Sequence, residues 1–222
     1  MKNLITIGLP SKGRLKNKSI SFFNDRGLKI LQSDKERNYF ASIENNSNIK
    51  IIYLHAKEII QRLGDGTLDI GISGLDLLYE SEKNLQNKIE VRTKLDFGGA
   101  NLVIAVPDDW IDVQTVADLE EVAFDIRFKR NSRLRVATKY PNLTNDFLIS
   151  KGVTQYKLIS SLGATETYPF IGSSEIITDI TSTGKTLNDN NLRVLKDAMI
   201  LKSQACLLIS KKSRNKVHSL KI

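Results

Sequence analysis

Short apolar runs alternate along this chain with longer segments whose apolar residues recur at helical spacing. The short runs are rich in Ile, Val and Leu, so each predicts a β-strand, and the longer segments predict helices. The predicted strands are 4–7, 39–43, 49–54, 68–72, 88–95, 102–106, 134–138, 156–160, 176–180 and a long β-rich stretch over 192–209. The predicted helices are a segment that opens at 10–14 and stops at Gly27, then 56–63, 76–81, 116–130, 142–150 and one from Thr186. Strands that alternate with helices predict an α/β fold with mixed or parallel sheets.

The same pattern predicts two lobes. The chain has no low-complexity linker, so two lobes have to be joined by strands that cross between them. We expect these crossings near 97–103 and 176–180. This assigns residues 1–97 and 178–222 to a discontinuous domain I and residues 98–177 to domain II, with a cleft between the lobes.

Composition excludes several kinds of site. One Cys and two His cannot form an internal disulfide or supply the four Cys or His ligands of a structural zinc site. At 222 residues the chain is long enough to form one or two ordinary domains without a disulfide or a structural metal. No run approaches the roughly 20 apolar residues that span a bilayer, and the N-terminus lacks the long apolar region of a signal peptide. We therefore expect a cytoplasmic protein with no membrane partner.

The charge balance is basic, with 33 Lys and Arg against 25 Asp and Glu and a net charge of +8. Such an excess is typical of proteins that bind nucleic acid, anionic membranes or small polyanions. It also follows from a compositional drift toward Lys, Asn and Ile, which carries no function. The basic tail after Lys211 favours a solvated or subunit-contacting terminus, because the chain has no nucleic-acid recognition motif. We expect no nucleic-acid partner.

Two segments, 68–74 and 177–184, share one pattern: an apolar strand ends in a hydroxyl residue and a glycine before a helix. Ligands of open α/β sheets bind beyond the carboxyl ends of strands, where glycine lets backbone N–H groups approach an anion. Ser73 with Gly74, and the loop that ends at Gly184, are thus candidate anion sites. Ordinary strand-to-helix turns are the alternative.

The second segment carries the string Asp-Ile-Thr-Ser-Thr-Gly-Lys-Thr, residues 179–186. It is not a Walker A loop, because that motif requires glycine where this chain has Asp179. A carboxylate beside an anion loop suits a sugar phosphate: the carboxylate accepts hydrogen bonds from ribose hydroxyls while the loop binds the phosphate. The residues of this predicted site are Asp179, Ser182, Thr183, Gly184, Lys185 and Thr186.

Lys12, Gly13 and Arg14 follow the first predicted strand and open a helix. Arginine offers bidentate hydrogen bonds to phosphate oxygens and lysine a compact charge, so the turn is a candidate polyanion site. A solvated helix start is the alternative.

Together these segments resemble the ATP phosphoribosyltransferases, the family that catalyses the first step of histidine biosynthesis. The resemblance covers nearly the whole chain, and its strings are 9–15, 66–76, 135–143 and 163–187. It implies a two-lobed fold similar to type II periplasmic binding proteins. It also implies transfer of phosphoribosyl from phosphoribosyl pyrophosphate to N1 of ATP, with release of pyrophosphate. Magnesium would arrive with the substrates rather than in a site made by the protein.

The resemblance also implies roles for individual residues. Asp179 would bind the ribose hydroxyls and 182–186 the 5-phosphate. Arg14 and Arg37 would neutralise the departing pyrophosphate, Arg37 in a neighbouring subunit's site. The residues on the ATP and pyrophosphate side would be Lys12, Gly13, Ser73, Gly74 and Glu166. The chain departs from the family at His55, where many members have arginine, and at Glu58, Ala100 and Asn101.

The family's long form carries a C-terminal regulatory domain, for which this sequence has no residues after Ile222. The resemblance therefore implies the short form, a homodimer that assembles with a regulatory subunit related to histidyl-tRNA synthetase. The chain has few nucleophilic side chains, and this scarcity is compatible with the reaction, because adenine N1 attacks with its own lone pair. The alternative is a two-lobed module that binds an amino acid or small anion without catalysis, since fold does not fix function.

Overall fold

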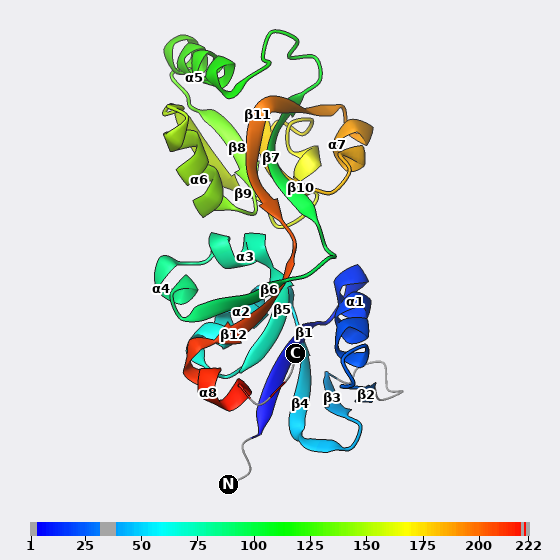
Figure 1. The fold of residues 1–222 in the computed structure, drawn as a ribbon. Coiled ribbons are helices and arrows are strands. Elements are labelled where there is room, and N and C mark those ends of the chain that lie inside the picture. The colour runs from blue at the N-terminus through cyan, green and yellow to red at the C-terminus, as the bar shows by residue number, and fades with distance from the viewer. Residues whose placement is uncertain (1–3, 32–38, 219, 221–222) are drawn as a thin grey trace. The chain divides into compact units, whose positions relative to one another are not determined.

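The computed structural model describes residues 4–31, 39–218 and 220. The chain forms two compact units, Met1–Gly99 with Gln204–Ile222 and Ala100–Ser203, and each is built on its own sheet (Figure 1). Within the described ranges, no helix is both long enough and apolar enough to cross a bilayer.

The first unit contains a seven-stranded sheet in the order β2-β3-β4-β1-β5-β12-β6. Its strands are β1 (Ile5–Pro10), β2 (Ile30–Leu31), β3 (Phe40–Ile43), β4 (Asn46–Leu54), β5 (Ile70–Gly74), β6 (Ile89–Lys94) and β12 (Ala205–Ser210). Its helices are α1 (Gly13–Asn24), α2 (Ala56–Asp65), α3 (Leu75–Glu80), α4 (Lys83–Gln86) and α8 (Arg214–Val217), with a 3-10 turn at Lys211–Ser213. β1 lies parallel to both β4 and β5, so the carboxyl ends of these three strands share one edge.

Alternation along the strands creates two separate core faces in this sheet. Ile70 and Ile72 of β5 pack with Phe23 of α1, whereas the intervening Gly71 faces α2. A Cβ atom on Gly71 would lie 2.5 Å from Ile59 of α2. Glycine is therefore required there for α2 to approach the sheet closely.

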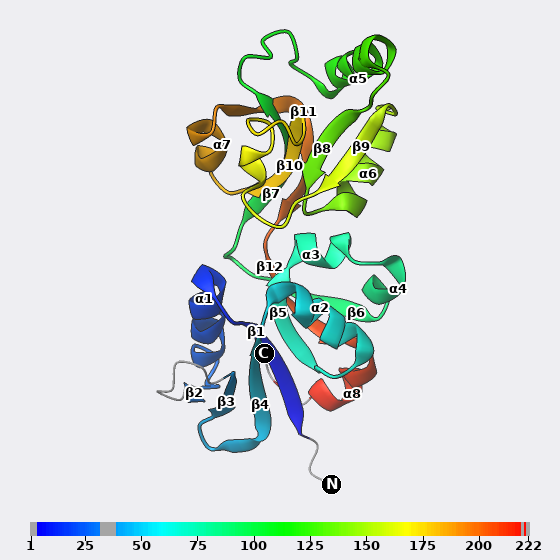
Figure 2. The same ribbon diagram turned by 180° about the vertical axis from the view of Figure 1, so that it is seen from behind.

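The second unit contains a five-stranded sheet in the order β11-β7-β10-β8-β9. Its strands are β7 (Ala100–Pro107), β8 (Leu134–Thr138), β9 (Tyr156–Ser160), β10 (Ile176–Thr181) and β11 (Leu192–Ser203). Its helices are α5 (Val116–Arg130), α6 (Pro141–Ser150) and α7 (Lys185–Asp189), with the 3-10 turn η1 (Thr165–Thr167). Figures 1 and 2 show α5 and α6 on one side of the sheet and α7 on the other, and the two core clusters of this unit divide in the same way.

The division of the chain differs from the expected one at its second boundary. The first crossing, at Gly99–Ala100, falls within the expected 97–103. The return comes at Ser203–Gln204 rather than near 178, so residues 178–203 lie in the second unit. The reason is strand pairing: β10 pairs with β7 and β8, and β11 pairs with β7. The cleft between the lobes stays a prediction.

Candidate functional site

Asp179 lies near the carboxyl end of β10, on the face of the sheet that carries η1 and α7. Its Oδ1 accepts a hydrogen bond from the backbone N–H of Ile180 at 2.8 Å. Burial of the side chain raises the pKa of Asp179 above its ordinary value, and nearby Glu166 raises it further. The bond from Ile180, the positive charge of Lys139 and a hydrogen bond from Thr165 oppose that rise.

Thr165 and Lys139 were not predicted as site residues, and both act on Asp179. Thr165 is completely buried, and its hydroxyl is 2.9 Å from that of Ser161. Lys139 follows β8, the parallel neighbour of β10. Nothing in the sequence marks Thr165 except its place beside Glu166, because its closeness to Asp179 depends on the packing of η1 against the sheet. The second unit therefore gathers Asp179, Glu166, Lys139 and Thr165 at one place.

The predicted phosphate loop runs from the end of β10 into α7. Gly184 has φ +76, a left-handed conformation that favours glycine, and a Cβ atom there would meet nothing within 4 Å. Glycine is thus needed for the backbone conformation and not for space. The N–H of Gly184 donates to Thr181 Oγ1 at 2.9 Å, and that of Lys185 donates to Thr183 Oγ1 at 3.4 Å. Ser182, Thr183 and Thr186 are exposed, so their hydroxyls are accessible to a ligand.

The first unit positions the other predicted residues. Lys12 precedes α1, and Gly13 begins this helix with φ +71. The helix has no side-chain cap at its N-terminus and no acidic residue in its first turn. Uncapped N–H groups and the positive end of the helix dipole favour an anion there. Arg14 lies in this first turn, and Arg37 lies outside the described residues.

Ser73 and Gly74 end β5, the parallel neighbour of β1, so they lie at the same sheet edge as the Lys12–Gly13 turn. The Ser73 hydroxyl is buried and donates to the carbonyl of Ala56 at 2.8 Å, which fixes the start of α2. A Cβ atom on Gly74 would collide with Oδ1 of Asp76. The structure therefore shows Ser73 in a structural contact and gives Gly74 a packing reason to be glycine.

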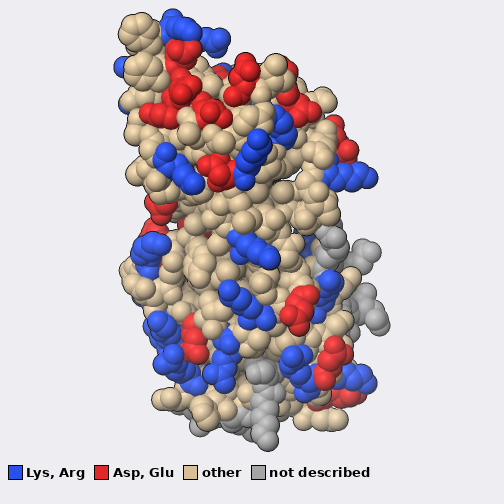
Figure 3. Space-filling view, turned by 45° about the horizontal axis from the view of Figure 1, so that its top comes forward, with Lys and Arg blue, Asp and Glu red and all other residues tan. Residues whose placement is uncertain are grey.

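The two units differ sharply in charge. Residues 1–99 with 204–222 contain 21 Lys and Arg against 12 Asp and Glu, which leaves +9, whereas residues 100–203 contain 12 against 13, which leaves −1. On the face drawn in Figure 3, acidic side chains gather around α5, and Lys and Arg dominate the first unit. The basic excess of the whole chain thus lies in the unit that carries Lys12 and Arg14, where a polyphosphate is favoured electrostatically.

In the described part of the chain, the donors around Asp179 do not by themselves form a complete magnesium site. Among the described residues, no three His, Cys, Asp or Glu side chains lie close enough together to hold a metal ion. Asp179 and Glu166 are near enough to influence each other electrostatically. Proteins usually bind Mg²⁺ through one or two carboxylates together with phosphate oxygens of the substrate. These residues therefore fit an ion that is carried mainly by a polyphosphate.

Solved structures with a similar fold support the two-lobed α/β class. The ATP phosphoribosyl transferase (HisG:HisZ) complex from Thermotoga maritima contains a chain that matches with a TM-score of 0.73 and 23% identity, over 96% of this chain and 90% of that one. The probable amino-acid ABC transporter extracellular-binding protein of Bacillus subtilis matches with a TM-score of 0.54 and 13% identity, over 97% and 88%. These likenesses confirm the expected fold class, which periplasmic-type binding proteins share.

Sequence comparison gives the family. A family model described as ATP phosphoribosyltransferase matches residues 55–222. The ATP phosphoribosyltransferase of Chelativorans sp. (strain BNC1) is 45% identical over 211 residues, which cover 95% of this chain and 92% of that protein. Such identity over nearly the full length of both chains shows that this chain belongs to the ATP phosphoribosyltransferase family.

Proposed function

We propose that the chain is the catalytic subunit of an ATP phosphoribosyltransferase, which transfers phosphoribosyl from phosphoribosyl pyrophosphate to N1 of ATP and releases pyrophosphate, the first step of histidine biosynthesis. The observation that carries this proposal is the partly buried Asp179 at the head of the 181–186 loop. A carboxylate would repel a bare phosphate but accepts hydrogen bonds from the hydroxyls of a sugar phosphate.

The attack in this reaction requires no proton transfer to a side chain of the protein. Adenine N1 attacks the anomeric carbon with its own lone pair, so no serine, cysteine or histidine base is required. The barrier lies in negative charge on the departing pyrophosphate and positive charge on the ribose ring. Catalysis is then mainly positioning and preorganised electrostatics. In this scheme Asp179 holds the ribose, residues 182–186 hold the 5-phosphate, and Lys12 and Arg14 balance the pyrophosphate charge, with Arg37 in the same role from a neighbouring subunit.

Glu166 is the second acidic residue of this site, and we assign it to the nucleotide side. It lies in η1 beside Thr165, which bonds to Asp179. Gly13, Ser73 and Gly74 supply backbone rather than side chains to the ATP and pyrophosphate side. Magnesium arrives with the two polyphosphates, whose oxygens provide most of its ligands.

Asp179→Asn is expected to weaken binding of phosphoribosyl pyrophosphate by about 1–3 kcal/mol, the range for hydrogen bonds to a charged group. The same substitution is expected to keep or raise the thermal stability of the chain, because burial penalises the carboxylate. Calorimetry measures the affinity and thermal unfolding the stability. The matched control is Asp189→Asn, which alters an exposed carboxylate on α7. Equal affinity of Asp179→Asn and the control would remove Asp179 from the site.

As the pH is lowered, substrate binding is expected to weaken at a higher pH than it would if Asp179 had the pKa of an ordinary aspartate. The pKa of Asp179 is raised, so the residue takes up a proton at a higher pH than its usual 3.8. Ionised Asp179 lowers the free energy of unfolding, because its carboxylate is partly buried. This destabilisation decreases as the pH falls through the raised pKa of Asp179. Affinity measured between about pH 7 and pH 4 should fall in the wild type more steeply than in Asp179→Asn. Protonation of the substrate's own phosphates affects the wild type and Asp179→Asn alike, so the variant is the control for it. Identical slopes of affinity against pH in the two proteins would contradict the assignment.

The activity is tested by incubating the chain, alone and with a candidate regulatory subunit, with ATP, phosphoribosyl pyrophosphate and magnesium. Mass spectrometry should detect phosphoribosyl-ATP and pyrophosphate. Neither product in either mixture would reject the enzyme and favour a binding module without catalysis.

We also propose that the chain forms a homodimer and assembles with a regulatory subunit related to histidyl-tRNA synthetase. The support is the Thermotoga maritima neighbour, which was solved as a HisG:HisZ complex. Light scattering with and without the second subunit tests the assembly. The single buried Cys206 fits the reducing cytoplasm in which we place the protein.

A further inference from the structure

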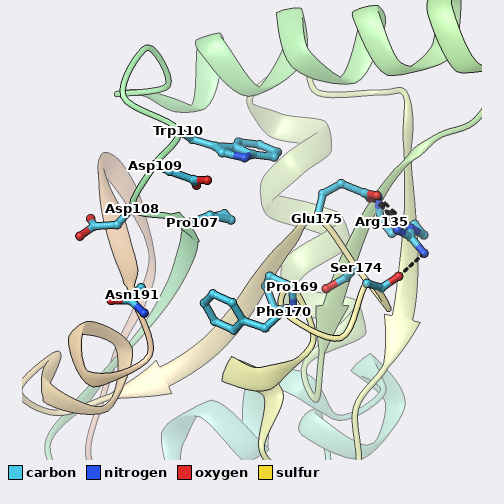
Figure 4. A pocket seen from close by; sticks show the side chains of 11 residues that line it. Pro107, Asp108, Asp109, Trp110, Arg135, Pro169, Phe170, Ser174, Glu175 and Asn191 are labelled. Atoms are coloured by element: carbon cyan, nitrogen blue, oxygen red, sulfur yellow. Dashed lines mark hydrogen bonds and ion pairs between the residues drawn. The ribbon is translucent and has the colours of Figure 1, made fainter.

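The second unit contains a cavity of about 630 Å³ that the proposed reaction does not use (Figure 4). Its size lies within the range of ordinary small-molecule sites. The lining residues that matter here are Pro107, Asp109, Trp110, Pro169, Phe170 and Ser174. They come from the end of β7, the segment before α5 and the segment between η1 and β10.

The cavity lies at the opposite end of the sheet from Asp179. β7 runs antiparallel to β10, with Thr181 paired to Asn101 and Ile177 to Ala105. Pro107 at the end of β7 therefore lies beside the start of β10, and Asp179 lies toward its far end. The cavity is a separate place on the same sheet, so it is not a part of the phosphoribosyl site.

Part of its wall is flat and apolar. Trp110 and Phe170 present aromatic rings, and Pro107 and Pro169 add rigid apolar surface (Figure 4). Aromatic rings attract organic cations through the negative face of their quadrupole, and tryptophan does so most strongly. Walls of this kind suit a ligand with a flat apolar body.

The charge around the cavity is negative. Its lining contains three carboxylates, of Asp108, Asp109 and Glu175, against the single guanidinium of Arg135, which leaves −2. Arg135 is committed to Glu175, with Nη2 at 2.6 Å from Oε1, and to the carbonyl of Gly172 at 2.8 Å. That pair is internally neutral. The net charge therefore comes from the two aspartates.

The two aspartates differ in their surroundings. Oδ1 of Asp108 lies 3.9 Å from Nε of Arg193, which partly offsets its charge. Asp109 is exposed, and no ion pair to it is seen among the described residues. It lies beside Trp110 in the chain, so a cation over the indole ring would find a carboxylate nearby (Figure 4).

Ser174 adds a polar group to the lining. The residue is 2% exposed, and its hydroxyl has no hydrogen-bond partner in the described part of the structure. It lies between the Arg135–Glu175 pair and Pro169 (Figure 4). The hydroxyl oxygen itself is closed to solvent, so it is part of the cavity wall and not a contact for a ligand.

We propose that this cavity binds a small organic cation, an ammonium or amidinium group on a flat apolar body, with the cation at Asp109 and Trp110 and the body against Phe170 and the prolines. This site is independent of the reaction proposed above.

The experiment uses the one tryptophan of the chain, Trp110, as the reporter. Its fluorescence is followed while the full chain is titrated with phenethylamine, and separately with 3-phenylpropionate, which has the same ring but a negative charge. Phenethylamine is expected to change the emission in a saturable way and to bind about tenfold more tightly than the anion. Equal binding of the two compounds, or no saturable change with phenethylamine, would overturn the proposal.

Variants locate the site. Asp109→Asn is expected to weaken phenethylamine binding about fivefold, as loss of an exposed charge partner predicts. Asp112→Asn changes an exposed carboxylate three residues away and should leave the binding unchanged. If Asp109→Asn does not fold, Asp108→Asn removes the neighbouring carboxylate of the same lining. Asp179→Asn should keep the affinity for phenethylamine while losing affinity for phosphoribosyl pyrophosphate. Equal losses in Asp109→Asn and Asp112→Asn would show a general charge effect and reject the site.

Discussion

Replacing Asp69 with alanine is expected to lower the free energy of unfolding of the first unit by about 3 kcal/mol. The residue is 4% exposed and lies just before β5. Its carboxylate accepts hydrogen bonds from the backbone N–H of Thr6 at 2.7 Å, from the Ser213 hydroxyl at 2.5 Å and from Nζ of Lys216 at 2.7 Å. Alanine removes the acceptor from all three donors at once.

The size of this effect follows from burial. Breaking a fully buried ion pair costs about 3–5 kcal/mol, because the remaining charge is left without a partner. The Lys216 side chain is 30% exposed, so its ammonium group can regain water, and the lower end of that range applies. Most of the loss then comes from the N–H of Thr6 and the hydroxyl of Ser213, which is buried.

The measurement needs a probe in the first unit, because Trp110 lies in the second. Hydrogen exchange at the amides of β1 and β5 provides it, and faster exchange there in Asp69→Ala than in the wild type is the expected result. Asp25→Ala is the matched control, since this exposed residue follows α1. Protection in Asp69→Ala equal to that of the control would show that the three hydrogen bonds do not stabilise the unit.

Arg14→Ala is expected to lower turnover about 10²-fold or more, the effect of removing one donor that acts on transition-state charge. Arg14 follows Gly13 in the first turn of α1, in the unit that carries the +9 charge. Under the proposed reaction, the charge on pyrophosphate grows as its bond to the ribose breaks, so a guanidinium there acts more strongly in the transition state than on the bound substrate. The loss should therefore fall mainly on kcat rather than on KM.

A second arginine near the same helix provides the control. Arg26 lies just beyond the other end of α1, stacks on the Phe22 ring at 3.7 Å and donates to the Phe22 carbonyl at 3.1 Å. Arg26→Ala removes the same charge from the same unit and should leave kcat nearly unchanged. Steady-state kinetics with pyrophosphate detection compares the two variants. Equal rates in Arg14→Ala and the wild type would refute the assigned role, and equal losses in both variants would assign the effect to net charge.

Local patterns predicted most elements of the fold. The helix over 116–130 and the strands over 134–138 and 156–160 have the expected bounds. The helix has clear end signals, a capping box at Thr115 with Asp118 and a left-handed Asn131 after its last turn. Such signals lie within a few residues of each other, so sequence reasoning can find them.

The second domain boundary could not be found in this way. The apolar stretch over 192–209 contains two strands, β11 and β12, that separate at Gln204 and join different sheets. Both strands contain apolar residues in a β-type pattern, and this pattern does not say which neighbour each strand will pair with. Pairing between β11 and β7 joins residues that are 85 (Leu192 and Pro107) to 103 (Ser203 and Ala100) positions apart along the chain.

The candidate site shows the same limit. The carboxylate of Asp179 and the loop after it form one continuous string and were predicted together. Lys139 and Thr165 influence the pKa of Asp179 because β8 and η1 pack against β10. Asp69 accepts a hydrogen bond from Lys216, which lies 147 residues away along the chain. Long-range partners of this kind have no signature in a single sequence.

The position of β12 has a consequence for how the chain folds during synthesis. β12 lies inside the first sheet, between β5 and β6, yet it follows the whole second unit in the chain. Residues 100–203 are continuous and contain all the strands of their sheet, so this unit can fold as soon as it has left the ribosome. The first unit must wait with the edges of β5 and β6 unpaired until residues 205–210 emerge. The N-terminal half of the protein is therefore the last to be completed, and during that interval its open strand edges are the part of the nascent chain most exposed to mispairing.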